Sequence, residues 1–322
     1  ALPVLPAVAA EPSCADQQAV VQAILRQYQS RQRRPLVVQA DRGRGKSAAL
    51  GMAAAQLLQQ GLTVRVTAPR PQAAETLLRF AGDHPANPVR FIAPDLLLQT
   101  LPPADVLMVD EAAALAPSLL LPLLQHYRCV VLATTVQGYE GTGQGFVLRF
   151  ARQLDQQFPG WSLLTLEHPM RWADGDPLEG FISDWLLLNA CCETPAPPGN
   201  GNDGLTVRDI TPVLSGLDEN LLRSVHGLLV AAHYRTRPSD FRTLLDGPNI
   251  RTWVVQHQNQ VVAVAMIATE GNLPEPLCEA IAAGRRRPHG HVLAQSLAVH
   301  LNVTNALRET SWRVVRIAVH SQ

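Results

Sequence analysis

A glycine, a lysine and a serine in succession follow a largely apolar run near the start of the chain. The run is Leu36 to Ala40, and Gly45, Lys46 and Ser47 come after the basic turn that it enters. This order is close to the P-loop pattern G-x-x-x-x-G-K-[ST], although Ala40 stands where the pattern has its first glycine. In such a loop, backbone N–H groups and the start of the next helix surround phosphate groups. The sequence therefore predicts a nucleoside triphosphate site, and the alternative is a basic surface turn before a helix.

Two side chains of this motif and two acids further along have roles in triphosphate chemistry. Lys46 is expected to contact the β- and γ-phosphates as a point charge, and the Ser47 hydroxyl to ligate Mg²⁺. The segment Val106 to Glu111, VLMVDE, is an apolar strand that ends in two carboxylates. At the carboxyl edge of a parallel sheet, Asp110 would hold the magnesium shell and Glu111 would orient and deprotonate the attacking water. Apolar strands that end in acids are common by chance, so this assignment depends on the P-loop before it.

Four further polar positions are candidates for nucleotide contacts. Gln17 lies near the start of a helix, and its amide is able to donate to and accept from an adenine edge. Thr135 and Gln137 lie where a strand pattern enters a glycine-rich loop, and we expect a γ-phosphate sensor there. Arg171 ends another strand pattern, and its guanidinium would stabilise charge on the transferring phosphoryl group. For Gln17 and Arg171 the alternative is a solvated surface residue, and for Thr135 and Gln137 it is a glycine-rich connection without a role.

Alternating helix and strand patterns surround these positions. The alternation predicts a parallel sheet that helices cover on both faces. Helical spacing occurs at Asp16–Leu25, Ala48–Gln60 and Gln72–Ala81, and strand patterns occur at Leu62–Ala68, Val89–Ala93, Cys129–Thr135 and Trp161–Arg171.

Prolines, glycines and asparagines crowd together between Cys191 and Gly204. We interpret residues 191–204 as a linker between a first domain, 1–190, and a second domain, 205–322. The second domain is predicted to have the order β-α-α-β-β-α-β. Its elements are predicted at Leu205–Ile210, Leu217–Tyr234, Ser239–Leu245, Arg251–His257, Val261–Thr269, Glu275–Ala283 and Trp312–His320.

The charge of the chain does not select a partner by itself. Lys plus Arg and Asp plus Glu both number 27, so nucleic acid would have to bind a local patch. Arg31, Arg33 and Arg34 form one such patch, and Arg285, Arg286 and Arg287 form another in a loop after the last helix. Arginine triplets of this kind are more often simply solvated.

Cysteine content and hydropathy restrict the class of protein. The five cysteines are odd in number and contain no C-x-x-C pair, which argues against a disulfide framework or a zinc site and favours a reducing cytoplasm. No apolar run is long enough for a membrane span, and the apolar N-terminus lacks the basic leader of a signal peptide. Because the first residue is not Met, we expect a piece of a longer protein.

Eight segments, taken in order, closely resemble the bacterial tRNA(Met) cytidine acetyltransferase family. They are ADRGRGKSA (40–48), VDEAA (109–113), TTVQGYEGTGQGF (134–146), HPMRWADGDPLE (168–179), AHYRTRPSD (232–240), GRRRPHG (284–290), AQSLAVH (294–300) and RIAVH (316–320). The resemblance implies a RecA-like, helicase-like P-loop ATPase domain followed by an incomplete GNAT-type acetyltransferase domain. It implies transfer of acetyl from acetyl-CoA to N4 of the wobble cytidine of elongator tRNA(Met), with ATP hydrolysis. The base for acetyl transfer stays unassigned.

The resemblance also carries site residues onto this sequence. It places acetyl-CoA against the backbone of Ile317, Ala318 and Val319, on a fourth strand that splays from its neighbour. The rival interpretations are an RNA-stimulated ATPase whose second domain only binds RNA or a partner, and a P-loop domain without hydrolysis. The resemblance places ATP against Gln17, Gly43, Arg44, Gly45, Lys46, Ser47, Ala48, Ala49, Leu50, Gly51, Met52 and Arg171.

Overall fold

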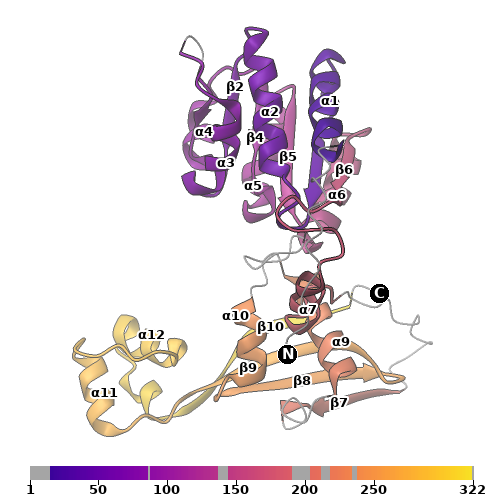
Figure 1. Cartoon of the computed structure of the whole chain (residues 1–322). Coiled ribbons are helices and arrows are strands. Elements are labelled where there is room, and N and C mark those ends of the chain that lie inside the picture. Colours follow the sequence, from indigo (N-terminus) through magenta and orange to yellow (C-terminus); the bar gives the residue numbers. More distant parts are fainter. Residues whose placement is uncertain are drawn as a thin grey trace, which may run out of the picture. The chain divides into compact units, whose positions relative to one another are not determined.

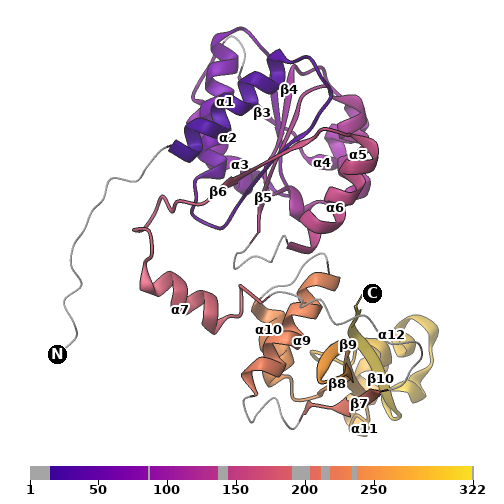
Figure 2. The same cartoon turned by 90° about the vertical axis from the view of Figure 1, so that its right-hand side faces the viewer.

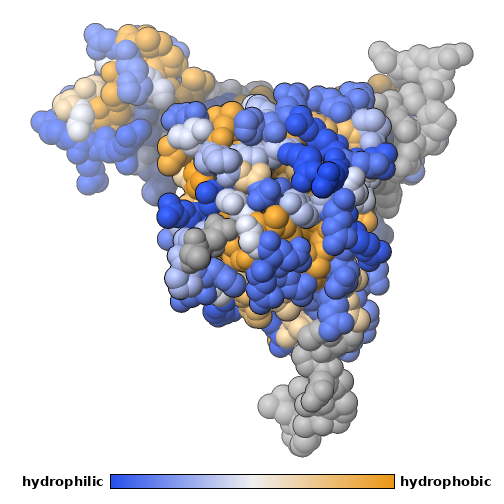
Figure 3. Space-filling model, turned by 90° about the horizontal axis from the view of Figure 1, so that it is seen from above, coloured by the Kyte–Doolittle hydropathy of each residue, from blue (hydrophilic) through white to orange (hydrophobic). Residues whose placement is uncertain are grey.

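The computed structural model describes residues 15–85, 88–136, 144–190, 204–211, 218–233 and 238–320. The chain divides into two compact units, Ala1–Leu188 and Asn189–Gln322, and Figure 1 shows the elements of each. Within the described ranges, every helix is too short or too polar to span a bilayer. Hydrophilic residues cover most of the face seen in Figure 3, and the hydrophobic residues are interspersed among them.

The first unit contains a parallel sheet, as the alternation predicts. Its six strands lie in the order β3-β2-β4-β5-β1-β6, and every pair is parallel. Strand β4 is apolar and fully buried, and its neighbours are buried at most positions, which is typical of a parallel sheet that is covered on both faces. The strands are β1 (Leu36–Ala40), β2 (Val64–Thr67), β3 (Arg90–Phe91), β4 (Val106–Val109), β5 (Val130–Thr135) and β6 (Ser162–Leu166).

Helices cover both faces of this sheet (Figure 2). One hydrophobic cluster packs α1, α2 and α3 against one face, and a second packs α4, α5 and α6 against the other. The predicted α/β arrangement is confirmed. The helices are α1 (Ala15–Gln29), α2 (Lys46–Gln59), α3 (Pro71–Ala81), α4 (Pro94–Thr100), α5 (Pro117–His126), α6 (Gln144–Gln157) and α7 (Pro177–Trp185).

Sequence periodicity did not predict α4, α5 or α7. Each begins with a proline in its first turn and is at most 10 residues long. A proline at the first helical position is favourable because its missing N–H would have no helical partner there. Prolines are also typical of turns, so the sequence alone did not distinguish these short helices from turns.

The second unit contains an antiparallel sheet of four strands in the order β10-β9-β8-β7. Helix α9 packs against β9 and β10. A two-residue hairpin turn joins β8 to β9: Gln258 and Asn259 both have positive φ, as a turn of this kind requires. The elements are β7 (Leu205–Asp209), α9 (Glu219–Ala232), α10 (Pro238–Asp246), β8 (Ile250–His257), β9 (Gln260–Gly271), α11 (Glu275–Ala282), α12 (Val292–Leu301) and β10 (Thr310–Val319).

The predicted order β-α-α-β-β-α-β is wrong at one place. Two helices, α11 and α12, lie between β9 and β10, and the arginine triplet 285–287 lies between those helices rather than after the last one. Helix α12 is VLAQSLAVHL, which is apolar on several sides, so it lacks the alternation of polar and apolar faces that identifies a surface helix. Its buried residues pack with α11 in a small separate cluster.

Candidate functional site

The P-loop and the paired acids meet at the carboxyl edge of the parallel sheet. Strand β1 lies beside β5, which lies beside β4, so the segments that follow Ala40, Val109 and Thr135 leave the same edge. The N–H of Val136 donates to the carbonyl of Ala40 at 3.0 Å. Helix α2 then begins at Lys46 with its N-terminus at this edge, where backbone N–H groups are available to an anion.

Three predicted residues are in direct contact. Lys46 Nζ lies 2.5 Å from Glu111 Oε1, and Thr135 Oγ1 donates to the two oxygens of Glu111 at 2.9 and 3.0 Å. Glu111 itself has a left-handed backbone, with φ of 51°, which turns the chain sharply after β4. Strand order therefore brings a lysine, a carboxylate and a hydroxyl together from three separate segments.

Lys46 is also distinctive in composition. It is the only lysine in the chain, so the other 26 of the 27 basic side chains are arginines. Arginine is a planar fork with five donors, whereas lysine is a compact point charge on a flexible stem. The chain therefore has its single lysine at the lysine position of the P-loop motif.

Asp110, which directly precedes Glu111, is fully buried. Burial raises the pKa of its carboxyl, while the charge of Lys46 and the hydroxyl of Ser47 oppose that increase. The N–H of Glu111 donates to Asp110 Oδ1 at 2.9 Å, whereas Oδ2 is buried without a hydrogen-bond partner among the described residues. A buried carboxylate oxygen without a partner fits a site for a cation or for a water bound to one.

These donors fit Mg²⁺ better than a metal that the protein alone would enclose. Among the described residues, no group of three or more His, Cys, Asp or Glu side chains is placed to hold a metal ion. Mg²⁺ usually takes one or two protein oxygens and completes its octahedron with phosphate and water. Ser47 and Asp110 are the residues that would hold it.

Gln17 lies against the P-loop, as expected for a nucleotide-binding residue. Its side-chain amide already donates a hydrogen bond to the loop backbone. The side chain is buried, and its Nε2 donates to the carbonyl of Arg44 at 2.7 Å. A Cβ on Gly45 would lie 2.9 Å from the same Nε2, so Gln17 packs directly on the loop. The Oε1 atom is buried and has no hydrogen-bond partner among the described residues. Gln17 therefore supports the loop, and contact with adenine stays a prediction.

Arg171 lies on a segment that the structure brings to the same loop. The N–H of the preceding residue, Met170, donates to the carbonyl of Gly43 at 2.9 Å. The side chain of Arg171 is exposed, and its contact with phosphate stays a prediction. Gln137, the second predicted sensor, lies outside the described residues.

His168 connects α1 to the end of β6. Asp16 Oδ2 accepts from the backbone N–H groups of Glu167 and His168 and lies 3.0 Å from His168 Nδ1. The hydrogen bond and charge of Asp16 raise the pKa of His168. Although burial acts to raise the pKa of Asp16, the hydrogen bonds from His168 and Glu167 hold it below its usual value.

Sequence reasoning missed two residues beside the P-loop. Glu179 Oε1 lies 2.6 Å from Arg44 Nη2, and Trp172 Nε1 donates to Glu179 Oε2 at 2.7 Å. Both residues lie in the segment HPMRWADGDPLE, which the resemblance includes. That resemblance was the available signal, because neither residue type has a P-loop role.

The predicted acyl-donor strand lies at a sheet edge in the second unit. Strand β10 pairs with β9 from Thr310 to Val319, with a bulge between Val314 and Arg316, and the described residues show no strand on its other side. The side chains of Ile317 and Val319 are exposed, and Ala318 is buried. No splay occurs between β10 and β9. Contact of this strand with acetyl-CoA stays a prediction.

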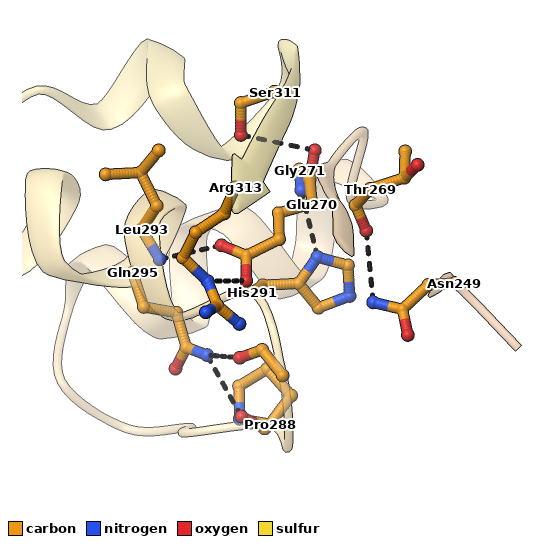
Figure 4. Close-up of polar contacts among 11 residues, drawn as sticks. Asn249, Thr269, Glu270, Gly271, Pro288, His291, Leu293, Gln295, Ser311 and Arg313 are labelled. Atoms are coloured by element: carbon orange, nitrogen blue, oxygen red, sulfur yellow. Dashed lines mark hydrogen bonds and ion pairs between the residues drawn. The ribbon is translucent and has the colours of Figure 1, made fainter. Parts of the chain in front are cut away.

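The arginine triplet directly precedes Pro288, which Gln295 of α12 contacts (Figure 4). Arg285, Arg286 and Arg287 are exposed. Just after them, Gln295 Nε2 donates to the carbonyls of Pro288 and Gly290 at 3.0 and 2.6 Å.

The helix that follows the triplet is held by a buried acid. Glu270 is 1% exposed and accepts from Arg313 Nε at 2.6 Å and from the N–H of Leu293 at 2.7 Å, in the first turn of α12. The N–H of Gly271 donates to His291 Nδ1 at 2.9 Å. The hydrogen bonds from Arg313 and Leu293 hold the pKa of Glu270 below its usual value, although burial acts to raise it. The ends of the arginine loop therefore have a defined position.

The other basic patch is partly used within the first unit. The Arg33 guanidinium donates to the carbonyl of Gln125, in the last turn of α5. A cation at the C-terminal end of a helix is favourable, because the last carbonyls have no helical partner. Arg33 is therefore less suited to an RNA phosphate than the sequence suggests.

Comparisons with known proteins agree with both units. Residues 37–189 match the model of the RNA cytidine acetyltransferase NAT10/TcmA helicase domain, and residues 224–322 match the model GNAT acetyltransferase 2. The chain belongs to the RNA cytidine acetyltransferase family. Both the helicase-like P-loop fold and the GNAT-type fold are confirmed as its fold class.

Curated relatives in this family resemble the chain over nearly its whole length. The tRNA(Met) cytidine acetyltransferase TmcA of Nitrosococcus halophilus is 46% identical over 95% of this chain, and that of Vibrio cholerae is 37% identical over 96%. The relative from Salmonella typhimurium is 39% identical over 87% of this chain. The chain spans 43%, 46% and 40% of these relatives, which is less than half of each.

Proposed function

We propose that the chain carries the ATPase and part of the acetyltransferase of an enzyme that forms N4-acetylcytidine at the wobble position, C34, of elongator tRNA(Met). The observation that carries the proposal is the contact of Lys46, Glu111 and Thr135 beside a buried Asp110, in a chain whose second unit is of the GNAT type. ATP, Mg²⁺ and acetyl-CoA are the proposed cofactors. We place the enzyme in the cytoplasm, where tRNA is available.

The proposed domains are an ATPase domain over 1–190, a linker over 191–204 and the first part of an acetyltransferase domain over 205–322. The ATP site would comprise Gln17, the loop and helix start from Gly43 to Met52, Thr135, Gln137 and Arg171. Lys46, Asp110, Glu111 and Arg171 would carry the hydrolysis.

In the proposed ATPase reaction, the residues act mainly by position and charge. The P-loop amides and Lys46 would hold the phosphates, and Ser47 and Asp110 would hold Mg²⁺, which supplies charge neutralisation when it is bound. Glu111 would orient the attacking water and accept its proton, and Thr135 would keep that carboxylate in place. For this, Glu111 must exchange its contact with Lys46 for a contact with water.

In the proposed acetyl transfer, the backbone at Ile317, Ala318 and Val319 would align the pantetheine arm of acetyl-CoA. The N4 amine of cytidine attacks the thioester carbonyl carbon, the C–S bond breaks, N4 loses a proton and the CoA thiolate gains one. Because that amine is a weak nucleophile, positioning and polarisation of the carbonyl would supply most of the rate. Hydrolysis of ATP would remodel or position the tRNA for this step.

The decisive variant is Lys46→Ala in the full-length enzyme. We expect ATP turnover to be abolished, because Lys46 is the side chain proposed to contact the β- and γ-phosphates. The measurement is phosphate release together with mass spectrometry of nucleosides from tRNA(Met). Unimpaired phosphate release would refute the site.

The rival function is an RNA-stimulated ATPase whose second unit only binds RNA or a partner. An acetyl-CoA titration of the intact protein by calorimetry separates the two. Saturable binding and acetylcytidine in tRNA(Met) support the proposal. Absence of both supports the rival.

A further inference from the structure

Three side chains fasten the P-loop to the segment that follows β6. Glu179, in the first turn of α7, binds Arg44 through one oxygen at 2.6 Å and the Trp172 indole through the other at 2.7 Å. The Arg44 guanidinium lies over the Trp172 ring, 5.8 Å from its centroid. We call Arg44, Trp172 and Glu179 the latch. Each member of the latch therefore contacts both of the others.

The backbone of the P-loop is also in contact with this segment. A Cβ on Gly43 would lie 2.5 Å from the Trp172 ring, and Gly43 has φ of 85°. A Cβ on Gly45 would lie 3.1 Å from Met170 Cγ. Since these two glycines give the loop its left-handed turns, the residues that pack on them restrict the shape in which the loop is held.

The latch is not an ordinary surface ion pair. The side chain of Arg44 is 11% exposed and that of Glu179 is 32% exposed. Exposed pairs contribute little because water screens them, whereas a largely buried arginine needs its partner. Glu179 also satisfies an indole N–H, so its loss would leave two donors without an acceptor.

We propose that Trp172 and Glu179 are positioning residues, which hold the P-loop ready for phosphate and thereby couple nucleotide binding to the attachment of α7. This inference rests on the proposed ATP site. It extends that site because neither residue touches phosphate. Arg44 joins the latch through Nη2, and its Nη1, which is buried without a hydrogen-bond partner among the described residues, stays within the proposed ATP site.

Coupling of this kind is reciprocal. If attachment of α7 favours the loop shape that binds nucleotide, then bound nucleotide stabilises attachment of α7 by the same factor. Helix α7 ends at Trp185, and the second unit begins at Asn189. Bound nucleotide would thereby stabilise the segment that leads into the second unit.

The test is Glu179→Ala in the full-length enzyme. We expect KM for ATP to rise about five- to tenfold with kcat within about twofold, because removal of a preorganising contact weakens binding of the ground state and the transition state alike. Glu179→Gln keeps an acceptor and should fall between Ala and wild type. The matched control is Glu75→Ala, an exposed carboxylate on α3.

The second readout is amide hydrogen exchange over residues 177–185 with and without ADP. We expect ADP to slow exchange in the wild type and in Glu75→Ala, and not in Glu179→Ala. An unchanged KM in Glu179→Ala overturns the proposal. A fall in kcat alone also overturns it, because a smaller folded fraction would give that result. If Lys46→Ala still turns over ATP, the ATP site itself is refuted. If Lys46→Ala is inactive and Glu179→Ala behaves as wild type, only the latch is refuted.

Discussion

His226 is a buried histidine on α9 that the proposed chemistry does not use. It is 4% exposed, and its ring centroid lies 4.8 Å from that of Phe241. Burial and the charge of Arg316 lower its pKa to about 4, while Asp240 acts in the opposite direction. The native state therefore holds this imidazole neutral at a pH where the unfolded chain protonates it.

The sign of the resulting pH dependence follows from proton binding. Between pH 6.5 and pH 4 the unfolded state binds more protons at His226, so the stability falls as the pH falls. Relative to neutral pH, we expect His226 to lower the free energy of unfolding by about 2 kcal/mol at pH 5, from the shift of its pKa.

His226→Leu should lose this sensitivity. The measurement is urea denaturation of wild type and variant at pH 7 and pH 5. The control is His300→Leu, at an exposed position on α12. Equal loss of stability in wild type and His226→Leu would show that other groups cause the acid sensitivity.

At the scale of elements, the close packing of α2 on α3 depends on a glycine. A Cβ on Gly51 would lie 2.4 Å from the carbonyl oxygen of Leu77 and 2.6 Å from Phe80 Cβ. Neither atom is the end of a flexible side chain, so the helices would have to move apart. Because α2 begins at Lys46, this packing helps to position the phosphate site.

Gly51→Ala tests that packing. Alanine favours a helix by about 1 kcal/mol, but overpacking against backbone costs about 1–3 kcal/mol or more. We expect a net loss of stability, measured by thermal unfolding. The matched control is Gly180→Ala in α7, where a Cβ meets nothing within 4 Å. That variant should be neutral or slightly more stable, and a Gly51→Ala protein as stable as the control would contradict the packing argument.

At the scale of the whole molecule, the proposed function needs a surface that holds tRNA. The loop with Arg285, Arg286 and Arg287 projects three cations from a well-anchored base, in a chain with equal numbers of acidic and basic residues. A local patch therefore has to supply the attraction to phosphate.

Replacement of all three arginines by glutamine should weaken tRNA binding and lower its salt dependence. Three lost phosphate contacts would reduce the slope of log K against log salt by about 2, at about 0.7 for each contact with single strands. Fluorescence anisotropy at several salt concentrations measures this slope. The control replaces Arg79, Arg90 and Arg242, which are also exposed. A slope equal to that of the control would exclude the loop as an RNA contact.

The sequence by itself determined the local parts of this protein. The P-loop and the strand VLMVDE are each a single continuous segment. The chemistry of each depends on residues that lie next to one another in the chain. Most helices and strands were also predicted, since burial of one face imposes a period of about two or 3.6 residues. Helices α4, α5, α7 and α12 were not predicted.

Only the tertiary structure decided which distant residues share a site. Gln17 reaches the carbonyl of Arg44 across 27 positions, and Lys46 reaches Glu111 across 65. The latch joins the P-loop to α7 because β1 lies between β5 and β6, which brings the segment after β6 beside the loop. Strand order results from packing of the whole sheet, and no local pattern of residues records it.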